Sequence, residues 1–64
     1  MDKTFDIFEC FSDGTKVWRD AIRGLDDALE RMRQLAAEST NRFEVLDMLS
    51  DQKVVATANH QYQA

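Results

Sequence analysis

Apolar residues recur at helical spacing in the middle of the chain more clearly than anywhere else. Between Leu25 and Ala36 they repeat every three or four residues, which is the period of one face of an α-helix. Asp26 and Asp27 place negative charge in the first turn, where the helix dipole favours it. The pattern predicts a helix near residues 24–38 that buries one stripe of side chains: Leu25, Leu29, Met32 and Leu35.

Strand-like segments lie on both sides of this helix. They alternate apolar and polar residues or are rich in residues that favour strands. Ser12-Asp13-Gly14 separates the first two and predicts a hairpin turn, because glycine tolerates the positive φ of such turns. The predicted strands cover residues 4–11, 15–22, 43–49 and 53–57.

The helix between the two strand pairs decides the topology of the sheet. It returns the chain across the sheet, so the third strand runs parallel to the second and can pair antiparallel with the first through a right-handed crossover. We therefore predict an α+β fold of ββαββ type, with one helix packed on one face of a four-stranded antiparallel sheet. We favour the strand order 2-1-3-4, and the order 1-2-3-4 stays open.

The length of the chain limits what can stabilise it. Its 64 residues predict one domain, with an ordered core at about 4–57 and a polar tail at 58–64. A domain of this size buries only about 60% of its unfolded surface, and such domains often gain stability from a disulfide, a metal or a partner subunit. Cys10 is the only cysteine, and no His/Cys set has the spacing of metal ligands. We therefore expect no metal and no cofactor. A partner subunit remains as the expected source of additional stability.

The charge balance argues against two classes of partner. Twelve acidic residues against eight basic ones give a net charge of −4, which repels nucleic acid and anionic membranes. The first residues lack the basic start and apolar stretch of a signal peptide, and no apolar run approaches the ~20 residues of a membrane span. With a lone cysteine, these features favour the cytoplasm and predict neither a nucleic-acid nor a membrane partner.

No set of residues in the sequence predicts enzyme chemistry. His60 is the only histidine and lies in the polar tail, away from any group that would hold or tune it. Cys10 has no neighbouring base that would activate its thiol. Asp6 and Asp20 could meet across the first hairpin only in one particular register. We expect no catalytic residue and interpret the chain as a non-enzyme.

Large apolar residues fall on both faces of the predicted sheet. A three-residue turn places Phe8 opposite Trp18, with Ile22 on their face, and Leu46 and Met48 share one side of the third strand. One helix covers only one face, so we expect the other face to meet a partner. Face-to-face stacking of two copies is our preferred geometry, and pairing of edge strands is the alternative. The candidate interface consists of Phe8, Trp18, Ile22, Leu46 and Met48.

Four short segments carry a resemblance to known proteins: Gly-Thr-Lys-Val-Trp, Gly-Leu-Asp-Asp-Ala-Leu, Phe-Glu-Val-Leu-Asp and Val-Val-Ala. Across residues 4–57 the chain resembles small bacterial ββαββ domains of unknown function, and antitoxins of the HicB type have a similar core. The resemblance implies the fold and no catalytic residue. We find no added DNA-binding segment of the kind such antitoxins carry.

The leading functional interpretation is therefore a protein–protein interaction module, either a homodimer or a subunit of a larger assembly. One alternative is a regulatory or antitoxin-like protein acting near nucleic acid, which would bind DNA in a salt-dependent way. The other is a small-ligand-binding domain that uses the aromatic face of the sheet, which would show a saturable change in Trp18 fluorescence.

Overall fold

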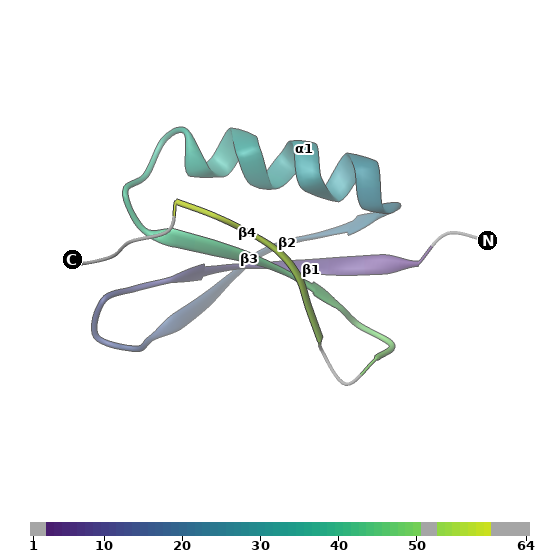
Figure 1. Ribbon diagram of the computed structural model, residues 1–64, viewed down its shortest axis with the longest axis horizontal. Helices are drawn as coiled ribbons and strands as arrows, with labels where there is room; N and C mark the ends of the chain where they lie inside the picture. Colours follow the sequence, from purple (N-terminus) through teal and green to yellow (C-terminus); the bar gives the residue numbers. More distant parts are fainter. Residues whose placement is uncertain (1–2, 51–52, 60–64) are drawn as a thin grey trace.

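The computed structural model describes residues 3–50 and 53–59. Its four strands form one antiparallel sheet in the order β2-β1-β3-β4, and the helix packs on one face of it (Figure 1). The predicted ββαββ fold and the favoured strand order are confirmed. The elements are β1 (Thr4–Cys10), β2 (Lys16–Arg23), α1 (Leu25–Ala36), β3 (Arg42–Asp47) and β4 (Lys53–Ala58).

The hairpin between β1 and β2 closes through the predicted turn. The amide of Gly14 donates to the carbonyl of Phe11 at 2.9 Å, and the amide of Phe11 donates to the carbonyl of Thr15 at 2.8 Å. Gly14 has a φ of +93°, and Oδ1 of Asp13 accepts from the amide of Thr15 at 2.9 Å. Three residues thus form the turn, and the expected opposition of Phe8 and Trp18 follows.

A β-bulge interrupts the pairing of β2 with β1. Phe8 lies opposite Trp18 and Ile7 lies opposite Asp20, so Arg19 is an extra residue without a partner in β1. An extra residue increases the local twist and reverses the alternation of faces beyond it. The second half of β2 therefore presents the opposite set of side chains to each face.

The bulge corrects the predicted position of Ile22. The prediction placed Ile22 on the face of Phe8 and Trp18, because it assumed uninterrupted alternation along β2. In the structure Ile22 lies opposite Phe5 and packs against the core beneath the helix. It is therefore not available to an interface on the other face.

The edge strand β4 contains a second bulge. Val54 lies opposite Leu46 and Ala56 lies opposite Val45, which leaves Val55 as the extra residue. Both edge strands of the sheet are thus irregular. β4 ends at Ala58, one residue beyond the end of the predicted strand, so it extends into the predicted tail. Residues 60–64 of that tail lie outside the described residues.

The core lies between α1 and the covered face of the sheet. Met32 and Leu35 are buried as predicted, and Leu29 packs partly buried against them. The predicted burial of Leu25 is wrong, because it is 43% exposed in the first turn, and Ala28 is the first helical residue to reach the core. The buried cluster consists of Phe5, Ile7, Ala28, Met32, Leu35, Ala36, Phe43 and Val45.

Candidate functional site

The face of the sheet opposite α1, called here the outer face, carries its side chains in rows across the strands. Residues that lie opposite each other in an antiparallel pair point to the same face. The first row is Lys16, Cys10 and Arg42; the second is Trp18, Phe8, Glu44 and Thr57; the third is Ala21, Asp6, Leu46 and Val54.

Trp18 is the most exposed large aromatic side chain of this face. It is 55% exposed, and its Nε1 donates to Oδ1 of Asp6 at 3.1 Å. Phe8, its direct partner, is partly buried, whereas Leu46 is buried. The structure thus brings three of the five predicted interface residues to one face.

Met48 lies outside the strands, because β3 ends at Asp47 and not at residue 49. It is exposed, and with Lys3, Thr4 and Leu49 it lines a hollow of about 260 Å³. The predicted place of Met48 beside Leu46 on one side of the third strand is therefore wrong, and its exposed side chain lies past the end of β3.

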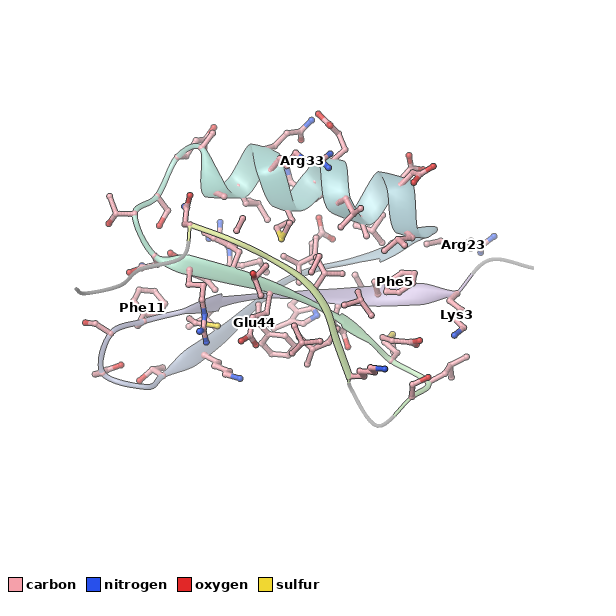
Figure 2. All side chains as sticks on the ribbon, in the orientation of Figure 1. Lys3, Phe5, Phe11, Arg23, Arg33 and Glu44 are labelled. Atoms are coloured by element: carbon pink, nitrogen blue, oxygen red, sulfur yellow. The ribbon has the colours of Figure 1, made fainter. Side chains whose placement is uncertain are left out.

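A carboxylate lies buried near the middle of the outer face. Glu44 is only 6% exposed; its Oε1 accepts from Nζ of Lys16 at 3.2 Å and its Oε2 from Nη2 of Arg42 at 2.9 Å. The labelled Glu44 lies near the middle of the sheet in Figure 2. Two cations thus share one carboxylate, and the Nε of Arg42 is buried with no hydrogen-bond partner among the described residues.

A hollow of about 420 Å³ opens at one end of the sheet, where the β1–β2 turn meets the connection between α1 and β3. Figure 1 shows these two segments at the same end of the molecule, and Figure 2 places the labelled Phe11 there. Among the described residues, the lining is mostly polar and carries one charge, that of Arg42. It consists of Cys10, Phe11, Ser12, Thr40, Asn41 and Arg42.

Glu9 fixes the connection that forms one wall of this hollow. Its Oε2 accepts from Nδ2 of Asn41 at 2.8 Å and from Oγ of Ser39 at 2.9 Å, and its Oε1 accepts from Arg19. The hydrogen bond from Asn41, together with those from Ser39 and Arg19, holds the pKa of Glu9 below its ordinary value. The bulge residue of β2 and the α1–β3 connection are thus joined through one buried carboxylate.

Asn59 holds the same connection from the other side. Its side-chain amide donates to the carbonyl oxygens of Ala36, Ser39 and Asn41 at 2.8, 2.9 and 3.1 Å. Neither Glu9 nor Asn59 was predicted from the sequence. The one feature of the sequence that could have pointed to Glu9 is its position as an acidic residue on the covered face of a strand. No feature of the sequence pointed to Asn59.

The other residues considered for chemistry do not assemble into a site. Cys10 is buried and unpaired with another cysteine. Asp6 binds Trp18 on the outer face, whereas Asp20 binds Arg31 of the helix at 3.0 Å, so the two carboxylates do not meet. Within residues 3–50 and 53–59, no three His, Cys, Asp or Glu side chains are grouped to hold a metal ion. His60 lies outside the described residues.

No protein-family model, curated protein or solved structure matches this chain. The resemblance to ββαββ domains and HicB-type antitoxins therefore stays a prediction. α1, the one helix in the described part of the chain, has 12 residues and is too short and too polar to cross a membrane.

Proposed function

We propose that this protein is a non-enzymatic protein–protein interaction module whose outer face stacks against that of a second copy. The observation that carries the proposal is Trp18, which is 55% exposed on the sheet face that no helix covers. Tryptophan is enriched at the centres of interfaces because it buries a large area at a small entropic cost. Phe8, which is partly buried, continues the apolar surface beside it, and the buried Leu46 lies beneath this face.

The charges of the outer face favour a second copy as the partner. Lys16, Arg23 and Arg42 lie on this face together with Asp6 and Glu44, although the whole chain carries a net charge of −4. Both signs are thus present, so opposite charges of two copies can face each other. A two-fold axis uses the same patch on both copies, so each cation can also approach an anion of the partner.

The area of the outer face decides how much of that face must take part in the proposed dimer contact. A stable interface removes about 800 Å² from each partner. Strands about 4.8 Å apart, with a rise of about 3.3 Å per residue, give a four-stranded face roughly 15–20 Å on each side. Its projected area of roughly 225–400 Å² is half or less of that figure, so the proposed contact must use all four strands and the surface beyond them, with Met48 and Val54 as well as Trp18.

The edge strands favour face stacking over edge pairing. Arg19 and Val55 interrupt the regular backbone ladder of β2 and β4. Bulges at sheet edges hinder pairing with another strand, and exposed lysines such as Lys16 and Lys53 add to that effect.

The proposal includes a cytoplasmic location, since an unpaired Cys10 suits a reducing compartment.

Light scattering coupled to size-exclusion chromatography tests the proposal. The parent chain is expected to show the mass of a dimer at micromolar concentration, and Trp18→Ser is expected to show that of a monomer. Val17→Ser is the matched control, because Val17 is 42% exposed but lies opposite Glu9 on the helix side of the same strand. A parent chain that is monomeric at high micromolar concentration contradicts the proposal, and so does equal dissociation by both variants.

A further inference from the structure

We propose that the hollow between the β1–β2 turn and the α1–β3 connection binds a small oxyanion, the carboxylate or phosphate group of a small molecule, with Arg42 as its charged partner. The hollow has a volume of about 420 Å³, and among the described residues that line it Arg42 is the charged one. A space of this size is within the range of small-molecule sites.

The local charge is positive although the chain as a whole is acidic. Arg42 and Lys16 both bind Glu44, so two positive charges face one negative charge. Lys16 and Arg42 lie on either side of Cys10 in one row of the sheet, directly beside the hollow. An anion in the hollow balances the remaining positive charge.

Arg42 has more donors than its neighbours have acceptors. Its guanidinium group carries five N–H donors. Nη2 binds Glu44, whereas Lys16 takes the second oxygen of that carboxylate, and the buried Nε has no partner among the described residues. Because Nε itself is buried, the exposed remainder of the guanidinium group is the part open to a ligand. Since the side chain is 41% exposed and lines the hollow, an oxyanion there can reach the guanidinium group.

The walls of the hollow are held in place before any ligand arrives. Asn41 is fixed by its bond to Glu9, and its carbonyl accepts from Asn59. On the opposite wall, the backbone bonds between Phe11 and Thr15 close the turn that carries Ser12. A preformed site loses little conformational entropy on binding. The Ser12 hydroxyl adds a neutral donor, and Phe11 gives the ligand an apolar wall.

Titrations followed by ¹⁵N–¹H NMR at constant ionic strength test the inference, with inorganic phosphate and acetate as separate probes and chloride as the reference. We expect saturable shifts at the amides of residues 10–12 and 40–42 with at least one probe. The probe that binds more tightly tells whether the group is a phosphate or a carboxylate.

Two arginine variants form the matched pair. Arg42→Gln is expected to weaken binding at least tenfold, whereas Arg31→Gln is expected to leave it unchanged. Arg31 is 42% exposed and binds one carboxylate, Asp20, on the helix side, so it matches Arg42 in exposure and pairing. Arg42→Lys keeps the charge and should retain most of the affinity.

Non-saturable or scattered shifts in the parent chain overturn the inference, as does an equal loss of affinity in the two glutamine variants. Should Arg42→Gln fail to fold, the mapped shifts of the parent chain and the affinity of Arg42→Lys still decide the question. Arg42 also belongs to the outer face, so the titrations are repeated with Trp18→Ser, whose amides at residues 10–12 and 40–42 should shift as in the parent chain. This comparison separates a failure of the oxyanion site from a failure of the proposed dimer.

Discussion

Trp18 donates its indole N–H at 3.1 Å to Asp6, which lies two residues along β1 from the direct partner of Trp18, Phe8. The bond runs diagonally across the outer face, a separation that aromatic side chains can span. Because the two residues come from neighbouring strands, the bond directs the ring towards β1. An exposed aromatic ring is therefore held in one orientation on this face.

Asp6→Ala should release the ring of Trp18. Trp18 is the only tryptophan, so the anisotropy of the intrinsic fluorescence should fall. The free energy of unfolding should drop by less than about 1 kcal/mol, since the bond is exposed to solvent. Asp6→Asn keeps an acceptor oxygen and serves as the control. Unchanged fluorescence in Asp6→Ala would show that the bond does not restrain the ring.

Met32 and Leu25 of α1 should differ in how much stability is lost when each side chain is shortened to alanine. Met32 is buried in the core, so Met32→Ala should lower the free energy of unfolding by about 2–4 kcal/mol. Leu25 is 43% exposed in the same helix, and Leu25→Ala should cost less than about 1 kcal/mol. Urea denaturation of the two variants measures the difference. Equal losses would place Leu25 in the core.

Glu9 should make the protein sensitive to acid. Its hydrogen bonds hold the pKa below the ordinary value in the folded state only, so the unfolded chain binds the proton more readily. The stabilisation is present above the ordinary glutamate pKa of about 4.3 and is lost as the pH falls through the lowered value. Asp47, whose pKa is lowered first by its hydrogen bond from Lys3, contributes with the same sign.

Unfolding measured between about pH 6 and pH 3 tests this prediction. Glu9→Gln should flatten the fall in stability over the acid range, because the variant has no proton to bind at this position. Glu30→Gln is the control, since Glu30 is exposed on the helix and pairs only with Arg33 at 3.6 Å. A parent chain whose stability stays constant across this range would rule out a linked carboxylate.

Gly14→Ala should destabilise the first hairpin through the backbone alone. The φ of +93° is unfavourable for any residue with a Cβ, yet a Cβ there would meet no atom within 4 Å. The expected cost is about 1–2 kcal/mol in the free energy of unfolding. This cost is measured by thermal unfolding of the Gly14→Ala variant, with Ser12→Ala in the same turn as the comparison. A melting temperature equal to that of the parent would argue against the left-handed conformation.

The order of elements could be predicted from the sequence because it depends on local patterns, and the strand order could be favoured because crossover connections are right-handed. The spacing of apolar residues marked the helix, and a three-residue turn at Ser12-Asp13-Gly14 predicted the opposition of Phe8 and Trp18 that the structure shows. The bulge at Arg19 could not be predicted in the same way. One extra residue leaves the composition of β2 unchanged and reverses the face of every residue after it, which is why Ile22 was assigned to the wrong side.

The hollow and its walls depend on contacts between distant parts of the chain. Glu9 meets Asn41 across 32 positions, and Asn59 meets Asn41 across 18. No periodicity or spacing predicts such pairs. The sequence gives no sign of the role of Arg42, because the carboxylate that it shares with Lys16 is brought to it only when β2 and β3 are placed on either side of β1.

The two bulges also limit how large an assembly of this protein can grow. Fibre growth by strand addition needs an uninterrupted backbone ladder at the growing edge. Arg19 disturbs that ladder in β2 and Val55 disturbs it in β4, so neither edge offers a regular template for another chain. Stacking around a two-fold axis, by contrast, ends with two copies. The positions of these two bulge residues thus protect the chain against open-ended polymerisation by strand addition.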